Sequence, residues 1–104
     1  MDLVLLGVGE DGHVASLFPG HPALDEKDRW VLPITDAPKP PPQRLTMTLP
    51  LINSARAVWF LVTGAPKAPI LSRILADPDG PLPAQRVHPR GPVTWWVDRA
   101  AHPA

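Results

Sequence analysis

One stretch decides the fold of this 104-residue chain: Leu3-Val4-Leu5-Leu6-Gly7-Val8-Gly9-Glu10-Asp11-Gly12-His13. Its first four residues form a continuous apolar run closed by glycines, which is typical of a strand buried on both faces inside a parallel sheet. A helix is predicted directly after it, because Asp11 can act as an N-cap and an apolar stripe follows. The stripe consists of Val14, Ala15, Leu17 and Phe18. Pro19-Gly20 is expected to end this helix.

Further along the chain, the strongest strand pattern covers residues 57–63, where nearly every residue is apolar. A helix is predicted over residues 66–76, with Pro69 acceptable only in its first turn. A last strand is predicted over residues 93–97. This alternation of strands and helices indicates an α/β fold with a parallel sheet.

The remaining segments are predicted to be short or irregular. They are an extended piece at 31–34, a polyproline-like loop at 38–42, a half-buried strand or extended edge at 44–49, a short helix at 50–55 and a helix start at 98–101. The 16 prolines of the chain favour such segments, because each proline fixes its own φ angle and lacks a backbone donor.

Composition and charge are those of a single globular domain. Ten basic residues balance ten acidic ones, so there is no electrostatic reason to expect nucleic acid or an anionic membrane as a partner. The apolar run at residues 3–6 is far too short to span a bilayer. The chain contains no cysteine, which excludes disulfides and thiolate chemistry and agrees with a cytoplasmic setting.

The glycines of residues 7–12 match the G-x-G-x-x-G fingerprint of dinucleotide-binding loops. Dinucleotide binding is nevertheless disfavoured, because Glu10 and Asp11 place two carboxylates where a pyrophosphate would approach. Ligands of open α/β sheets bind at the carboxyl ends of the strands. Two segments are expected to meet there, residues 7–13 and residues 64–67.

Several separated motifs occur in a fixed order along the chain. They are DLVLLGVGEDGHVASLFPG (2–20), PKPPPQRLTMTLP (38–50), VTGAPKA (62–68), LPA (82–84) and WVD (96–98). Together these motifs resemble those of the 6-phosphogluconolactonase family, in the superfamily that includes glucosamine-6-phosphate deaminases. The resemblance covers nearly the whole chain.

This resemblance implies a Rossmann-like three-layer α/β fold, with residues 1–104 as the C-terminal portion of a single domain that lacks its N-terminal half. It implies hydrolysis of 6-phospho-D-glucono-1,5-lactone to 6-phosphogluconate in the oxidative pentose phosphate pathway, which is the activity of a carboxylic ester hydrolase. It further implies that no cofactor and no metal is needed, that the partner is a small phosphosugar lactone and that the location is cytoplasmic. The oligomeric state is left open.

The resemblance makes His13 the general base. An imidazole, with an ordinary pKa of about 6.5, can take a proton from the attacking water and return it to the departing ring oxygen. On the residues alone, a histidine in a first helical turn more often makes a cap or surface contact. Asp11 has two interpretations: it holds the imidazole or the substrate, or it serves only as an N-cap. Gly9 and Gly12 are expected to let backbone N–H groups approach the developing oxyanion.

The resemblance makes Lys67 a phosphate ligand. Lys67 follows Gly64, where the strongest strand meets a helix N-terminus, and free N–H groups and the helix dipole favour anions there. The alternative is a solvated lysine. Arg44, beside the proline loop, can make a two-pronged contact with phosphate or carboxylate, and a structural salt bridge is its alternative. Lys39 is a weaker candidate for the same site.

Three competing interpretations remain. In the deaminases a glutamate follows the shared Asp-Gly-His core, whereas the matching position here is Phe18, which cannot relay or orient a proton. A sugar-phosphate effector domain of a transcription regulator needs a DNA-binding helical segment and has no use for a catalytic histidine. An inactive fragment of a lactonase is the third. A metal site around His21, Asp25, Glu26 and Asp28 is not expected, because their spacing fits no ligand set.

Overall fold

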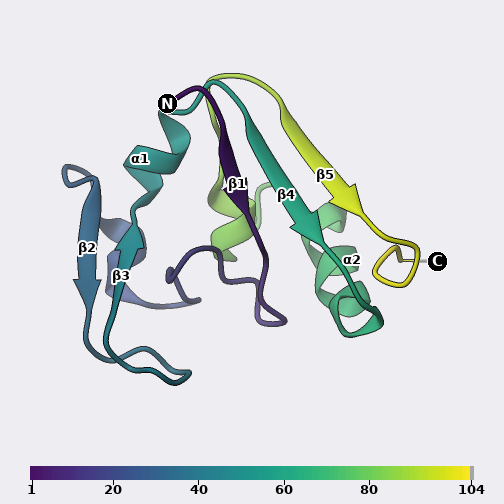
Figure 1. The fold of residues 1–104 in the computed structure, drawn as a ribbon, viewed down its shortest axis with the longest axis horizontal. Helices are drawn as coiled ribbons and strands as arrows, with labels where there is room; N and C mark the ends of the chain where they lie inside the picture. Colours follow the sequence, from purple (N-terminus) through teal and green to yellow (C-terminus); the bar gives the residue numbers. More distant parts are fainter. Residues whose placement is uncertain (104) are drawn as a thin grey trace.

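The computed structural model describes residues 1–103, and its centre is a three-stranded parallel sheet (Figure 1). The strands are β1 (Val4–Leu6), β4 (Val58–Val62) and β5 (Val93–Val97), in the spatial order β1-β4-β5. Val4 is in register with Val58, and Phe60 with Trp95. The predicted α/β fold with a parallel sheet is therefore confirmed.

The crossover between β4 and β5 carries the main helical layer. The 3-10 turn η2 (Ala65–Lys67) leads into α2 (Ala68–Ala76), and Pro69 is the second residue of α2, inside the first turn as required. Ile70, Leu71 and Ile74 of α2 are buried. A further 3-10 turn, η3 (Pro83–Arg86), precedes β5 and was not predicted.

A smaller antiparallel sheet pairs β2 (Val31–Ile34) with β3 (Arg44–Met47). The sequence predicted both segments as extended but did not predict that they pair. The helix α1 (Leu49–Asn53) follows β3, and its N-cap Thr48 donates a hydrogen bond to the carbonyl of Arg29 at 2.5 Å. One more 3-10 turn, η1 (Pro22–Asp25), lies between β1 and β2.

The helix predicted after β1 does not form, and this prediction is wrong. Gly12 has a φ of 89° and Ala15 a φ of 50°, and both values lie outside the right-handed helical region. Asp11 accepts a hydrogen bond from the backbone N–H of His13 at 3.0 Å, which is the local contact that stabilises an Asx turn instead of a helix. Residues 98–101 likewise form a turn rather than a helix start.

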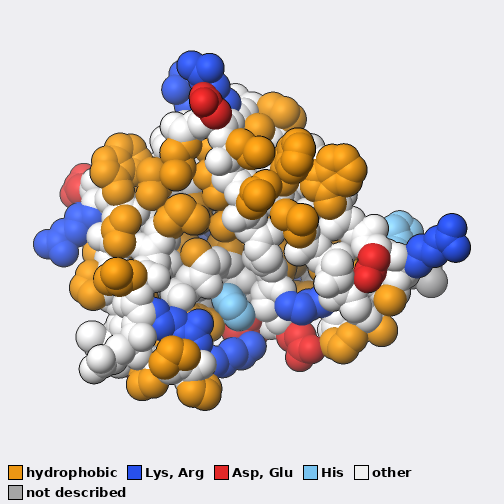
Figure 2. Space-filling model, in the orientation of Figure 1, with side chains coloured by type: hydrophobic (Ala, Val, Ile, Leu, Met, Phe, Trp, Pro, Cys, Tyr) orange, Lys and Arg blue, Asp and Glu red, His pale blue; other side chains and the backbone are white. Residues whose placement is uncertain are grey.

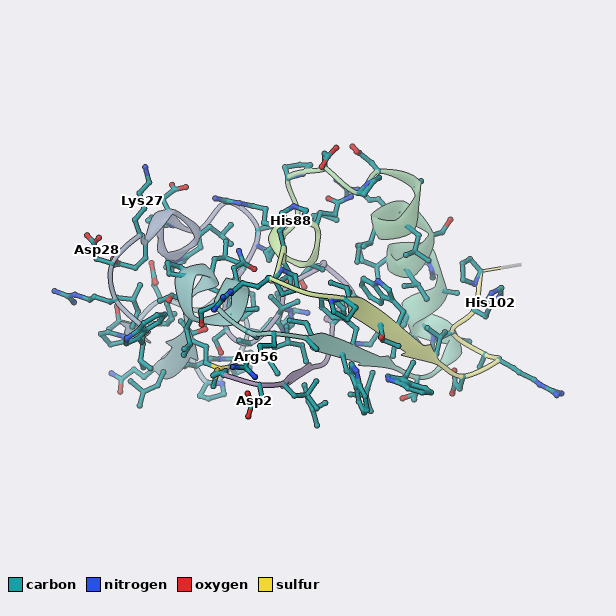
Figure 3. The ribbon with its side chains drawn as sticks, turned by 90° about the horizontal axis from the view of Figure 1, so that it is seen from above. Asp2, Lys27, Asp28, Arg56, His88 and His102 are labelled. Carbon is teal, nitrogen blue, oxygen red and sulfur yellow. The ribbon has the colours of Figure 1, made fainter. Side chains whose placement is uncertain are left out.

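One face of the parallel sheet is covered and the other is exposed. Figure 3 shows α2 and η3 on the same side of β4 and β5, and Figure 2 shows hydrophobic side chains gathered over the strands on the opposite side. The exposed set is Leu3, Leu5, Trp59, Leu61 and Trp96, each 38–58% exposed. The prediction that β1 is buried on both faces is wrong, because the helical layer of residues 1–103 covers one face only.

Within residues 1–103, no helix is long and apolar enough to cross a membrane.

Candidate active site

The site lies where the carboxyl ends of β1 and β4 meet. These strands are neighbours and parallel, so the loop after β1 and the turn after β4 emerge at the same edge of the sheet. The ammonium group of Lys67, in η2, donates a hydrogen bond to the carbonyl oxygen of Val8 across a sequence separation of 59 residues. The predicted meeting of segments 7–13 and 64–67 is confirmed.

Asp11 and His13 form a close pair inside this loop. Oδ1 of Asp11 lies 2.6 Å from Nδ1 of His13 and also accepts the His13 backbone N–H at 3.0 Å. A carboxylate can only accept hydrogen bonds, so in the neutral ring Nδ1 carries the hydrogen and Nε2 keeps its lone pair. Asp11 contacts the imidazole and caps no helix in this structure, whereas its part in the reaction stays a prediction.

The charge of Asp11 is stabilised by its surroundings. Partial burial acts to raise the pKa of this carboxyl, but the hydrogen bonds from the backbone and ring of His13 and the charges of His13 and Lys39 outweigh it. The pKa of Asp11 is therefore lowered from its ordinary value. The ammonium group of Lys39, from the proline loop, lies 3.9 Å from Oδ2.

This lowered pKa predicts a pH-dependent contribution of Asp11 to folding. A carboxyl whose pKa is depressed in the folded state stabilises the fold above its unfolded pKa, and this stabilisation is lost as the pH falls through the folded pKa. Asp11→Asn should therefore be less stable than the unsubstituted chain at pH 7, and the difference should shrink as the pH falls below about 4. Urea unfolding between pH 3 and pH 7 measures it.

Asp2→Asn is the matched control, because the side chain of Asp2 is 90% exposed and its contact with Arg56 is a surface ion pair of 3.7 Å. Figure 3 shows Asp2 and Arg56 close together beside β1. The two variants should differ at neutral pH and converge in acid. A constant difference between Asp11→Asn and the unsubstituted chain over the whole range would contradict the assigned direction of the shift.

His13 and Lys67 line the same hollow. Its volume is about 360 Å³, and its lining residues are Gly7, Val8, Gly9, His13, Ala15 and Lys67. The hollow therefore contains an imidazole at one position and an ammonium group at another. Two larger hollows lie beside residues 25–27 and contain none of the predicted site residues, so chemistry and not size locates the site.

The amides of Gly9 and Gly12 are already engaged. The N–H of Gly9 donates to the carbonyl of His13, and the N–H of Gly12 donates to the carbonyl of Gly9, both at 2.9 Å. Both bonds close the loop on itself, and the expectation that the two glycines let backbone N–H groups approach an oxyanion stays a prediction. The carbonyl of Gly12 accepts a hydrogen bond from the N–H of Ala84 at 3.1 Å, so the turn η3, which the sequence did not predict, is bonded to this loop.

The start of α2 also differs from expectation. The N–H groups of Lys67 and Ala68 donate to the carbonyls of Gly64 and Ala65, and a proline at 66 or at 69 has no N–H to offer. These positions supply no free amide for an anion. In this segment, the ammonium group of Lys67 is therefore the candidate for a contact with phosphate.

Arg44 braces the proline loop. Its Nε donates to the carbonyl of Pro41 at 2.9 Å, and its Nη2 donates to those of Lys39 and Pro40 at 3.0 Å. Within residues 1–103 it pairs with no carboxylate, so the salt bridge considered as its alternative is not formed. Its contact with phosphate stays a prediction.

Phe18 is a residue of the site that the sequence did not indicate. Its ring centroid lies 4.6 Å from that of His13 at an interplanar angle of 36°, and the guanidinium carbon of Arg44 lies 5.3 Å from the Phe18 centroid. The sequence predicts of Phe18 only that it cannot relay or orient a proton, as the glutamate of the deaminases does. No signal in the sequence indicated this contact, because the segment has the apolar spacing of a helix and the contact depends on the turns at Gly12 and Ala15.

His21 has a structural role. Its Nδ1 accepts the N–H of Ala23 as the N-cap of η1, and its Nε2 lies 2.8 Å from Oδ1 of Asp36. No group of three or more histidine or acidic side chains within residues 1–103 is arranged to hold a metal ion.

Comparison with known proteins shows the family to which the chain belongs. The family model described as glucosamine-6-phosphate isomerases/6-phosphogluconolactonase matches residues 1–96. The chain belongs to this family of phosphosugar enzymes. Within it, the chain is 56% identical to the 6-phosphogluconolactonases of Rattus norvegicus and Homo sapiens, over 96% of its own length.

Solved structures agree as well. The crystal structure of 6-phosphogluconolactonase from Thermotoga maritima superposes with a TM-score of 0.80 at 37% identity, over 93% of this chain and 43% of that one. The chain spans 39% of the rat relative and 40% of the human one. The resemblance deduced from the motifs, and the Rossmann-like fold it implied, are confirmed.

Proposed function

We propose that this chain carries the hydrolytic site of a 6-phosphogluconolactonase and acts on 6-phospho-D-glucono-1,5-lactone. The observation that carries the proposal is the Asp11–His13 pair, joined at 2.6 Å, in a hollow that Lys67 also lines. A carboxylate that fixes Nδ1 leaves Nε2 as the ring nitrogen that can accept a proton, which is the requirement for a general base. The 56% identity to curated lactonases supports the same activity.

In the proposed reaction, Nε2 of His13 removes a proton from a water molecule as its oxygen bonds to the lactone carbonyl carbon. The carbonyl oxygen then carries the negative charge of a tetrahedral intermediate. When the intermediate collapses, the bond from this carbon to the ring oxygen breaks and the imidazolium returns the proton to that oxygen. The products are a carboxylic acid, which ionises in water, and a free hydroxyl group. Asp11 stabilises the imidazolium during the step.

Lys67 is proposed to hold the phosphate of the substrate. Its ammonium group is a mobile point charge of the kind that binds phosphate, and it reaches the loop that bears His13. The bond to the Val8 carbonyl leaves two further N–H donors on the ammonium group. Because the phosphate takes no part in bond breaking, this contact should be equal in the ground and transition states.

Lys67→Ala is therefore expected to raise KM for the phosphorylated lactone by about tenfold to a hundredfold, with a smaller effect on kcat. Binding of 6-phosphogluconate, measured by titration calorimetry, should weaken by the same factor, and this measurement needs no turnover. The unphosphorylated lactone should be a poor substrate for both proteins and should differ little between them. Initial rates must be corrected for spontaneous hydrolysis.

Lys27→Ala is the matched control, since Lys27 is an exposed lysine away from the site (Figure 3). Equal losses on both lactones would mean that Lys67 serves the loop through Val8 and not the phosphate. Phosphosugar binding without any hydrolysis would favour the effector-domain alternative, and neither binding nor hydrolysis would favour an inactive fragment.

The proposal extends to the setting of the enzyme. A chain without cysteine and with ten basic and ten acidic residues suits a cytoplasmic enzyme that binds a small phosphosugar and no nucleic acid. The proposed chemistry needs no metal or cofactor, because water and an imidazole suffice for an activated ester. The matched share of the relatives, about 40%, supports residues 1–104 as part of a single lactonase domain, proposed to be its C-terminal portion.

A further inference from the structure

The imidazole of His13 lies directly against Gly9. A methyl group on Gly9 would lie 2.0 Å from Nδ1 of His13, 2.1 Å from Cε1 and 2.7 Å from Oδ1 of Asp11. The φ angle of Gly9 is not in the left-handed region, whereas that of Gly12 is 89°. Glycine is therefore required at position 9 for space and at position 12 for backbone conformation.

Phe18 bounds the same imidazole at another place. It is 1% exposed, and its ring is separated from that of His13 by 4.6 Å between centroids. A ring that is packed on nearly all sides has little freedom to move. The imidazole is thus confined by three contacts that differ in kind: the hydrogen bond that its Nδ1 donates to Asp11, the bare backbone of Gly9 and the ring of Phe18.

Arg44 connects this aromatic contact to the proline loop. Its guanidinium group lies over the Phe18 ring, within the range of a cation–π contact, and two of its nitrogens are bound to carbonyls of the proline loop. Lys39, in the same loop, places its ammonium group 3.9 Å from Oδ2 of Asp11, the oxygen that does not contact His13. The loop therefore reaches both members of the Asp11–His13 pair by separate routes.

We propose that Phe18 is a positioning residue, whose ring, backed by Arg44, holds the His13 imidazole where Nδ1 meets Asp11 and Nε2 stays open to the hollow. Asp11 alone fixes one atom of the ring and allows the ring to rotate about that hydrogen bond. Packing against Phe18 removes this freedom. The effect on hydrolysis rests on the proposed function, but the orientation of the ring does not.

Phe18→Leu tests the proposal, because it keeps a buried apolar side chain and removes the flat ring. Nitrogen-15 NMR of the imidazole should show one tautomer, with hydrogen on Nδ1, in the unsubstituted chain and a mixture of tautomers in the variant. The kcat for the lactone should fall by about tenfold to a hundredfold, the loss that a misplacement of about 1 Å can cause. KM should change by less than about threefold, since substrate contacts are kept.

Phe60→Leu is the matched control. Phe60 is equally buried, at 1% exposed, but stacks on Trp95 instead of His13. It should lose stability, as Phe18→Leu does, while the His13 spectrum and kcat stay as in the unsubstituted chain. A Phe18→Leu protein that keeps a single tautomer and its kcat overturns the proposal, and so does an equal change of the spectrum in both variants.

If the Phe18→Leu protein does not fold, two further measurements test the proposal. Phe18→Met gives the same comparison with a more adaptable side chain. In the unsubstituted chain, nuclear Overhauser contacts must join the ring protons of Phe18 to those of His13, and their absence also overturns the proposal. A chain that shows the contacts and the single tautomer but hydrolyses no lactone counts against the proposed function alone.

Discussion

Replacing His13 with alanine or asparagine should lower kcat for the phosphorylated lactone by about 10²–10⁴, the usual contribution of general base catalysis. The reason is geometric. Nδ1 of His13 is hydrogen-bonded to Oδ1 of Asp11 at 2.6 Å, so Nε2 is the nitrogen that can take the proton of water. Neither an alanine nor an asparagine side chain can take this proton. The loss should appear in kcat more than in KM, because the proton moves only in the transition state.

The His13 variants should remain folded. The side chain of His13 is 19% exposed and lies at the edge of the core, so its removal leaves no enclosed cavity. His102→Ala is the control, because His102 is an exposed histidine near the other end of the chain (Figure 3). Near-normal kcat in a folded His13→Ala protein would remove His13 from the mechanism and leave Asp11, or a group outside residues 1–103, as the base.

Phe60→Ala should lower the free energy of unfolding by about 3–5 kcal/mol, the cost of removing a large aromatic side chain from a packed core. Phe60 lies in the central strand β4, is 1% exposed and stacks on Trp95 with 4.0 Å between ring centroids. A domain of this size is stable by only about 5–15 kcal/mol. The variant should therefore be close to unfolding at 37 °C.

Leu61→Ala is the control for Phe60→Ala. Leu61 is the next residue of the same strand, but its side chain points to the opposite face and is 49% exposed, so its removal should cost less than about 1 kcal/mol. Urea unfolding followed by circular dichroism gives both values. Equal losses would mean that the exposed face of the sheet is covered in solution, and a dependence on protein concentration would identify a second copy of the chain as the cover.

Local pattern predicted the elements that form the parallel sheet. Residues 57–63, apolar nearly throughout, and residues 93–97 are predicted as strands, and the structure has β4 at Val58–Val62 and β5 at Val93–Val97. The prediction for α2 succeeded for a similar reason, because its buried residues recur at helical spacing and Pro69 falls in the first turn. In these segments the local preference and the tertiary packing favour the same conformation.

Local pattern failed where a side chain competes with the backbone. The apolar spacing after Asp11 is helical, but the Asp11 carboxylate binds the N–H of His13 and two residues take positive φ angles. The same competition converts Asp11 from an N-cap into the partner of His13. The sequence also did not predict the pairing of β2 with β3, because local pattern indicates that each segment is extended but not which segment lies beside it.

By itself, the sequence determined the strands and the helix of the parallel layer, because residue type and spacing act over a few neighbouring positions. Its motifs supplied the candidate residues of the site through their resemblance to a known family. Only the tertiary structure decided which face of the sheet is covered, that Lys67 reaches Val8 and that Phe18 lies against His13. The first depends on the side of the sheet on which the crossover between β4 and β5 packs. The second depends on the parallel pairing of strands more than fifty residues apart, such as Val4 with Val58. The third depends on the turns at Gly12 and Ala15, whose φ angles of 89° and 50° replace the helix that the apolar spacing predicted.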